Sequence, residues 1–378
     1  MNLDFSDDQK QLQAQVRRFL GERCTPATVR AILEGPEPFD RALYAGLAEM
    51  GVLGAAIPEA YGGVGLSHLE LCLFAEELGR VIAPVPVASS IYLAAEFLLQ
   101  AGSEAQKKAW LPKLASGEAV GTFGLVEGQG RMTPAKVQVT ARDGRLTGTK
   151  TLVADGIAAD LAVVAARTGA GSGPEAVSLF LVDLNGPGVS RKPLETIDPT
   201  RSYAAISFDG APAEALGGTG DGWHIASQVL DRAAILMAFE QVGGADHALE
   251  MARDYALERM AFGRPIGSFQ AIKHMLADMY VAATLARSNC FYGAWALATG
   301  AAELPVAAAT ARVSATTAFQ QCAKNNIQVH GGMGFTWAFD CHLYYRRSNA
   351  LALALGSLST WESQLIERMR AGNVEAAA

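Results

Sequence analysis

The spacing of apolar residues changes twice along the chain, and this limits the fold more than any other feature of the sequence. Residues 1–117 carry apolar side chains on a helical period, residues 118–217 hold short stretches in which apolar and polar residues alternate, and residues 218–378 return to the helical period. A period near 3.6 buries one face of a helix, whereas a period of 2 buries one face of a strand. The sequence therefore predicts a mainly α protein with a central β domain, in three domains with those boundaries.

The helix predictions rest on start signals as well as on the period. Ser6, followed three residues later by Gln9, forms a capping box that predicts a helix start. Residues 223–259 have apolar side chains on a helical period and no proline in the interior, so we expect one long helix there. Further helices are expected over the ranges 69–78, 91–101, 272–297, 305–328 and 340–370.

The central domain contains a hairpin signal. Residues 137–140 and 146–150 have strand character and flank Asp143-Gly144, a pair that is favoured in two-residue hairpin turns. Because helical stretches do not alternate with the strands, this segment predicts an antiparallel sheet rather than a dinucleotide-binding Rossmann unit. Further strands are expected over the ranges 161–166, 177–184 and 204–208.

Composition narrows the class of partner. The formal net charge is −7, which argues against a nucleic-acid partner, since proteins that bind nucleic acids carry a basic surface. No run approaches the ~18 consecutive apolar residues of a membrane span, and the first residues lack the basic and apolar regions of a signal peptide. The five cysteines include no C-x-x-C pair, which is typical of reduced thiols in a cytoplasmic protein, and no metal site is expected.

Three short segments carry the clearest chemical signal. Residues 259–263 read R-M-A-F-G, Gln270 follows shortly after, and residues 328–332 read Q-V-H-G-G. An arginine can hold the pyrophosphate of a dinucleotide, because its planar guanidinium donates two charge-assisted hydrogen bonds. Glycines let the main chain approach a ligand closely. Each residue alone is explained by an ion pair, a packed core or a turn, and only the combination in this order is specific.

In these segments, and in the order of its domains over essentially its whole length, the chain resembles the acyl-CoA dehydrogenase family, FAD enzymes that oxidise acyl-CoA thioesters between Cα and Cβ. The resemblance implies the family's three-domain fold, with a helical N-terminal domain, an antiparallel β domain and a C-terminal helical bundle. It also implies FAD as cofactor, an acyl-CoA thioester as substrate, an electron-transferring flavoprotein as electron acceptor, and an oligomer whose subunits share the FAD site. The residues that it assigns to the cofactor are Arg259, Phe262, Gln270, Gln328, Gly331, Gly332 and Ser357.

The resemblance also implies a catalytic base, but this sequence lacks the usual glutamate. The family places it either in a Y-E-G-T segment near the C-terminus or in an E-R pair on the long helix before R-x-x-F-G. Counting without gaps, the first position is Leu355, followed by Gly356-Ser357, and the second pair is Ala233-Ala234. Neither leucine nor alanine can accept the α-proton of a thioester.

Two acidic residues on the same helix are alternative bases. Asp231 lies two residues before Ala233 and is turned ~200° around the helix, so it is expected to face away. Glu240 lies seven residues after Ala233, on the same face but ~10 Å along the axis. Because its neighbours are apolar, Glu240 is expected to be buried. It then either has a structural partner or acts as a base with a raised pKa.

The segments that the family uses to line the flavin ring and the thioester depart from its pattern as well. Where the family has T-E-P-x-x-G-S-D, residues 125–132 read L-V-E-G-Q-G-R-M, and only Glu127 matches. Where the family has a W-I/V-T-N strand beside the ring, residues 152–155 read L-V-A-D. The loss of bulky side chains here and at Ala233-Ala234 predicts room for a branched or ring-bearing acyl group.

These observations leave three functions open. In the first, the chain is the base-less subunit of a mixed oligomer, as in two-chain enzymes of sterol side-chain breakdown, and it completes an FAD site whose base a related chain provides. In the second, the chain is a self-sufficient homo-oligomeric dehydrogenase with Glu240 or Asp231 as the base. In the third, it is a flavin monooxygenase or oxidase on the same fold.

Overall fold

The computed structural model describes residues 5–377, with side chains through Gly372. The chain forms two compact units that interleave along the sequence. Unit 1 consists of Met1–Arg30, His68–Ala83 and Ala234–Ala378, and unit 2 consists of Ala31–Ser67 and Pro84–Ala233. The three domain boundaries expected from the sequence stay a prediction.

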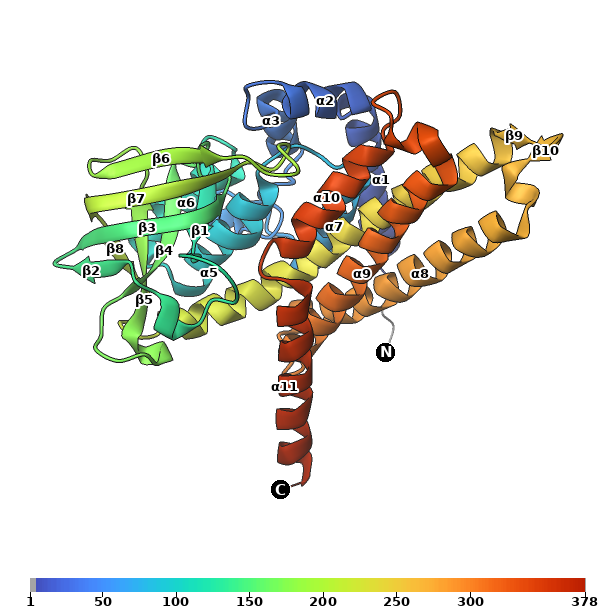
Figure 1. Cartoon of the computed structure of the whole chain (residues 1–378). Helices are drawn as coiled ribbons and strands as arrows, with labels where there is room; N and C mark the ends of the chain where they lie inside the picture. Colours follow the sequence, from blue (N-terminus) through green and yellow to red (C-terminus); the bar gives the residue numbers. More distant parts are fainter. Residues whose placement is uncertain (1–4, 378) are drawn as a thin grey trace. The chain divides into compact units, whose positions relative to one another are not determined.

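Unit 1 is a bundle of helices. They are α1 (Asp7–Arg23), α4 (His68–Arg80), α7 (Gly222–Glu258, which belongs to unit 1 from Ala234 on), α8 (Gln270–Thr299), α9 (Leu304–His330), α10 (Cys341–Leu353) and α11 (Leu358–Ala377), as labelled in Figure 1. The predicted capping box is confirmed, because the Ser6 hydroxyl accepts from the Gln9 amide at 3.2 Å and the Gln9 Oε1 accepts from the Ser6 amide at 2.8 Å. These bonds satisfy free amides of the first turn, so α1 begins directly after Ser6.

Two glycines allow α4 and α7 to cross in direct backbone contact. A Cβ on Gly79 would lie 1.8 Å from the Glu240 carbonyl oxygen, and a Cβ on Gly243 would lie 1.9 Å from the Glu76 carbonyl oxygen. Only glycine permits so close an approach. The crossing therefore fixes where Glu76 and Glu240 lie in the bundle.

The C-terminal helices differ from the prediction at one point. The long helix predicted over 223–259 is confirmed as α7, but the single helix predicted over 340–370 is wrong, because the chain breaks between α10 and α11. At the break Leu355 has φ +62° and Gly356 has φ +104°, values that a right-handed helix does not allow. Apolar residues keep a helical spacing on both sides of the break, so the period gives no sign of it.

Unit 2 holds the sheet. Its strands are β1 (Gly121–Gly124), β2 (Thr140–Arg142), β3 (Arg145–Ala154), β4 (Leu161–Arg167), β5 (Val177–Asp183), β6 (Val189–Leu194), β7 (Tyr203–Pro212) and β8 (Glu214–Leu216). They pair in the order β6-β7-β3-β2-β4-β5-β8, and β1 pairs with β4. The predicted hairpin is confirmed, since β2 and β3 pair around Asp143 (φ +49°) and Gly144 (φ +69°), the left-handed pair of a type I′ turn.

The sheet is mixed, so the prediction of a purely antiparallel sheet is wrong. β1 and β2 each pair in parallel with β4, while the other neighbouring strands are antiparallel. A parallel pair needs a long connection between its strands. The β2–β3 hairpin provides that connection between β1 and β4, and nothing in the local sequence pattern indicates which strand β1 will join.

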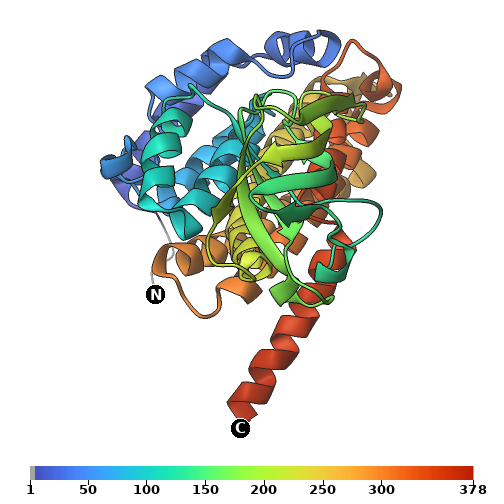
Figure 2. The ribbon, with the colours of Figure 1, turned by 90° about the vertical axis from the view of Figure 1, so that its left-hand side faces the viewer.

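Helices cover one face of the sheet within unit 2 (Figure 2). The π-helix η2 (Ala88–Ala95) packs against β1 and β4, so closely that a Cβ on Gly121 would lie 2.4 Å from the Ala94 Cβ. The remaining helices are α3 (Arg41–Glu49), α5 (Glu96–Ala101) and α6 (Glu104–Ala115) in unit 2, and α2 (Pro26–Glu34), which spans the boundary between the units. In the described part of the chain, no helix is long and apolar enough to cross a membrane.

Candidate cofactor site and base positions

The R-x-x-F-G segment forms a tight hairpin at the end of α7. β9 (Met260–Ala261) pairs with β10 (Arg264–Pro265), and the turn between them consists of Phe262 and Gly263, with φ +52° and +80°. Glycine adopts this conformation freely, whereas phenylalanine is strained in it. The turn leaves Phe262 95% exposed, so its ring is available to a ligand or to a second chain.

The Q-V-H-G-G segment ends α9. Gly331 terminates the helix with φ +60° and ψ −140°, a conformation that is open to glycine and strained for other residues. A Cβ added to Gly331 or to Gly332 would meet nothing within 4 Å. The main chain at both glycines therefore has room for a ligand to approach it.

An aromatic stack joins these two segments. Tyr255, one turn before Arg259 on α7, stacks on His330, the last residue of α9, with 4.1 Å between ring centroids and 22° between ring planes. The ring of Phe339 packs edge-on against both. Burial lowers the pKa of His330, which keeps the imidazole neutral at pH 7. The stack brings the two segments together at the end of unit 1 where β9 and β10 lie (Figure 1).

The side chains at this end fit a dinucleotide cofactor. Arg259, Gln270 and Gln328 are exposed and offer a guanidinium and two amides, groups that bind phosphate and adenosine well. Gln270 begins α8, and its Nε2 contacts the His274 Nε2 at 2.8 Å. Because these groups lie on the surface of the chain, a cofactor held here remains accessible to a second chain. Their assignment to FAD stays a prediction.

Ser357 lies apart from this end, at the junction of α10 and α11. Its hydroxyl accepts from the Thr360 amide at 3.3 Å and so caps the first turn of α11. Tyr255 and His330 are not among the residues that the sequence predicts for the site. The histidine inside Q-V-H-G-G is the one available signal, and its stacking partner is evident only from the fold.

One of the two positions at which the resemblance places a base, Leu355, packs in an apolar cluster. Leu355, at the break between α10 and α11, and Ala234, on α7, are far apart in the sequence but pack together in unit 1. The other members of the cluster are Ala309, Val313, Trp361 and Leu365. Ala234 takes the arginine position of the E-R pair, and the assignment of Leu355 and Ala233 as the usual base positions stays a prediction. Ala233, which precedes Ala234, is also fully buried.

Glu240 is buried in an ion pair. Its Oε1 lies 3.6 Å from the Arg347 Nη1, and both side chains are 1% exposed. Arg347 also donates from Nη2 to the Ile82 carbonyl at 3.1 Å. The burial predicted for Glu240 is confirmed, and its arginine partner is the arrangement expected of a structural carboxylate. Asp231 is 6% exposed and belongs to unit 2, and the roles of both residues as bases stay predictions.

The segments expected to face the flavin ring lie in unit 2. Glu127 binds the buried Lys150 of β3 and accepts from the Val139 amide at 2.9 Å. Burial lowers the pKa of Lys150 to about 8, and Glu127 opposes this shift. Two residues later β3 leaves its register, and Leu152 has φ +49° with its side chain 51% exposed. An exposed aliphatic side chain thus stands at the position where the resemblance predicts tryptophan.

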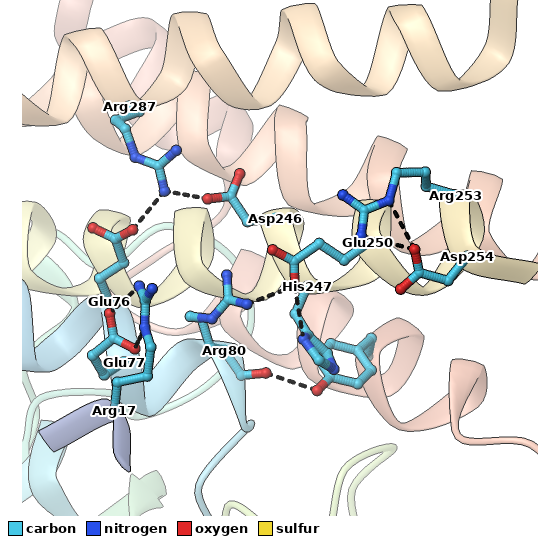
Figure 3. A network of polar contacts seen from close by, with 11 residues as sticks. Arg17, Glu76, Glu77, Arg80, Asp246, His247, Glu250, Arg253, Asp254 and Arg287 are labelled. Carbon is cyan, nitrogen blue, oxygen red and sulfur yellow. Dashed lines mark hydrogen bonds and ion pairs between the residues drawn. The ribbon is translucent and has the colours of Figure 1, made fainter. Parts of the chain in front are cut away.

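A separate network of ion pairs ties the helices of unit 1 together (Figure 3). Arg287 of α8 contacts carboxylates of both α4 and α7. The pairs of the network are Arg17–Glu77, Arg80–Glu250, Arg287–Glu76 and Arg287–Asp246. Because these carboxylates face guanidinium groups, their charges compensate one another, and the network serves the packing of α1, α4, α7 and α8.

Comparisons with known proteins agree with this arrangement. Residues 6–118 match the family model for the acyl-CoA dehydrogenase N-terminal domain, and residues 220–369 match that for the acyl-CoA dehydrogenase C-terminal domain. The acyl-CoA dehydrogenase IpdE2 of Mycobacterium tuberculosis is 32% identical over 353 residues, which cover 93% of this chain and 94% of that protein.

Two solved structures extend the similarity to the fold. A chain of the ChsE4-ChsE5 complex from Mycobacterium tuberculosis is 29% identical, with a TM-score of 0.88 and coverage of 98% of this chain and 99% of that one. A chain of the Tcur3481-Tcur3483 steroid ACAD is 30% identical, with a TM-score of 0.88 and coverage of 97% and 99%.

The fold and the matched domains define an FAD-dependent oxidoreductase that acts on CH–CH bonds. The chain belongs to the acyl-CoA dehydrogenase family. The mainly helical fold with a central sheet and the FAD cofactor, both predicted from the sequence, are thereby confirmed.

Proposed function

We propose that this chain is the base-less subunit of a mixed-oligomer acyl-CoA dehydrogenase, which oxidises an acyl-CoA thioester between Cα and Cβ. In this proposal the chain completes an FAD site shared with a related chain, and the related chain provides the glutamate that removes the α-proton. The observation that carries the proposal is the nature of the side chains at the two usual base positions: Leu355, which packs in an apolar cluster, and Ala233, which is fully buried. Neither side chain has a group that accepts a proton, so neither of the usual positions supplies a base.

This chain contributes the end of unit 1 that holds Arg259. The guanidinium of Arg259 binds the pyrophosphate, and the main chain at Gly331 and Gly332 approaches the ADP portion. Phe262 provides apolar surface beside Arg259. When bound, FAD supplies the acceptor for the hydride that leaves Cβ.

The ion pair of Glu240 argues against a self-sufficient enzyme. With its Oε1 at 3.6 Å from Arg347 and both side chains 1% exposed, Glu240 reaches a thioester only if the pair separates. Separating a buried ion pair leaves an uncompensated charge, at a cost of about 3–5 kcal/mol. This cost favours the mixed oligomer over a homo-oligomer in which Glu240 is the base.

The relatives support both the mixed oligomer and a substrate class. The ChsE4-ChsE5 and Tcur3481-Tcur3483 structures are each named for two chains, and the second is a steroid ACAD. The aliphatic or small side chains of Leu152, Ala233 and Ala234 favour a branched or ring-bearing acyl group, such as one derived from a sterol. An electron-transferring flavoprotein is the electron acceptor in this proposal, and the cytoplasm is the location.

The proposal is tested by anaerobic titration of the purified chain with straight-chain and steroid-type acyl-CoA thioesters, with and without the related chain. We expect the visible absorption of the flavin to bleach only when both chains are present. Bleaching of FAD on this chain alone would overturn the proposal and point to Glu240 or Asp231. Insertion of oxygen into a product in air would instead favour the monooxygenase.

A further inference from the structure

The proposed cofactor end is built from two segments that are remote in the sequence. The hairpin is tied to α7, because the Arg259 amide donates to the Tyr255 carbonyl at 2.8 Å and the Ile266 amide donates to the Arg259 carbonyl at 2.8 Å. The glycine segment is tied to α9, because Gly331 follows His330 directly. A shift of Tyr255 therefore carries Arg259 with it, and a shift of His330 carries Gly331.

The stack of Tyr255 on His330 is held from several sides. The His330 ring is fixed by a contact of its Nδ1 with the Asn326 carbonyl at 2.9 Å, and its side chain is 6% exposed. The chain after it folds back tightly, so that a Cβ on Gly334 would lie 2.7 Å from the Ile327 carbonyl oxygen and 3.0 Å from the His330 Cβ. These contacts hold the His330 ring in place, and Tyr255 stacks on it.

The stack of Tyr255 on His330 matters because the two segments that it connects are proposed to hold one FAD molecule. A binding group must be placed within ~0.5 Å of its productive position by neighbours that are themselves locked. Arg259 lies four residues after Tyr255, and Gly331 and Gly332 directly follow His330. Without the stack, the position of each segment would depend only on the helix that it follows.

We propose that Tyr255 and His330 are positioning residues of the cofactor site. Their stack sets the distance between the Arg259 guanidinium and the main chain of Gly331 and Gly332, so that both bind the same pyrophosphate and adenosine group. The inference rests on the proposed function, since it takes this end of unit 1 as the FAD site. Tyr255 and His330 themselves do not bind FAD.

The test measures the affinity of the apoprotein, in the oligomer as purified, for FAD and for ADP by fluorescence titration. Tyr255→Leu and His330→Leu remove the stack and are expected to weaken both ligands by about tenfold, since an aromatic pair contributes energy on that scale. Tyr255→Phe keeps the ring and is expected to stay within about twofold of the unaltered protein. The double leucine variant is expected to lose no more than either single one, because the two residues act as a pair.

Phe291→Leu is the matched control. Phe291 stacks on Phe239 elsewhere in unit 1, at 6.2 Å and 17°, so its loss is expected to lower the melting temperature and leave FAD affinity unchanged. If Phe291→Leu and Tyr255→Leu weakened FAD binding equally, the stack of Tyr255 on His330 would have only a structural role, and the inference would be overturned. Unchanged FAD affinity in a folded Tyr255→Leu protein would overturn it as well.

Two further results separate this inference from the proposed function. If the unaltered oligomer binds neither FAD nor ADP, the proposed function fails and the inference with it. If it binds both and the leucine variants bind equally well, only the inference fails. If a leucine variant does not fold, His330→Phe, which keeps a stacked ring, is compared with His330→Gln, which removes the ring. Equal FAD affinity of these two variants would overturn the inference.

Discussion

Two places in unit 1 combine a strained backbone with opposite chemistry. At the β9–β10 hairpin, Phe262 has φ +52° and exposes its ring three residues after the polar Arg259. At the break between α10 and α11, Leu355 has φ +62° but packs its side chain into an apolar cluster. A non-glycine residue in this conformation costs of order 1–3 kcal/mol, so both places need support from their surroundings.

The support differs in kind. At the hairpin, two paired strands close the turn and the exposed side chains are available to a ligand. At Leu355, the Trp361 Nε1 donates to the Leu355 carbonyl at 3.1 Å and α11 packs beside it. The backbone at this usual base position is thus held by a hydrogen bond and by packing, without an acidic side chain. The backbone conformation of a site and its reactive side chain can be lost separately, because different atoms maintain them.

The largest expected effect on stability concerns the buried interior of unit 1, at the ion pair of Glu240 and Arg347. Glu240→Gln removes the carboxylate that faces Arg347 and should lower the free energy of unfolding by about 3–5 kcal/mol, measured by chemical denaturation. Flavin reduction by the assembled oligomer should not change. Replacing Arg347 as well, in Glu240→Gln/Arg347→Met, should restore much of the stability. A stable Glu240→Gln protein that no longer reduces its flavin would show that Glu240 is the base.

The next effect concerns the cofactor end. Arg259→Ala removes charge-assisted hydrogen bonds worth about 1.5–3 kcal/mol, so FAD affinity should fall by about 10- to 150-fold. The measurement is a fluorescence titration of the apoprotein. Arg253→Ala is the control, because Arg253 pairs with Asp254 on the surface of the same helix at 57% and 58% exposure. An equal loss in Arg253→Ala would mean that net charge, and no specific contact, is responsible.

A smaller effect at Gly331 and Gly332 distinguishes a change in stability from a change in FAD affinity. A Cβ on Gly332 meets nothing within 4 Å, so Gly332→Ala should change the free energy of unfolding by no more than about 0.5 kcal/mol. FAD affinity should nevertheless fall severalfold, because the methyl group occupies the space through which a ligand approaches. Gly331→Ala should cost about 1–2 kcal/mol of stability in addition, owing to its positive φ. Full FAD affinity in Gly332→Ala would exclude close approach at this residue.

The smallest effect is a pH dependence of the stability that His330 contributes. Burial lowers the pKa of His330 from its ordinary value of 6.5, so the unfolded chain binds this proton more readily than the folded one. The stability contributed by neutral His330 is therefore present above pH 6.5 and is lost as the pH falls through the lowered pKa. The difference in unfolding free energy between the unaltered protein and His330→Leu should shrink on acidification. A difference that is independent of pH below 6.5 would contradict this.

Some of the structure follows from local sequence. Ser6 and Gln9 determine the start of α1, because both capping bonds lie within four residues. Asp143-Gly144 determines the turn between β2 and β3, because both residues accept a positive φ. The uninterrupted period of residues 223–259 determines α7 for a similar reason, since each turn buries the same face.

Other features depend on contacts that the local pattern does not contain. The single helix expected over 340–370 is interrupted at Leu355, where Trp361 and the cluster outweigh helix propensity. The sheet expected to be antiparallel is mixed, because β1, which the sequence pattern did not predict, pairs in parallel with β4 across the intervening β2–β3 hairpin. Register and pairing across such distances are set by burial, and a period of 2 is the same in either direction.

By itself the sequence determined the succession of helical, strand-rich and again helical segments, the hairpin turn and the motifs that carry Arg259 and Gly331. These depend on backbone preferences and on neighbours within a few residues. Only the tertiary structure decided that Leu355 meets Ala234 and that Glu240 faces Arg347. It also decided that Tyr255 stacks on His330. Each of these pairs joins residues far apart in the chain, so burial and packing of whole helices bring them together.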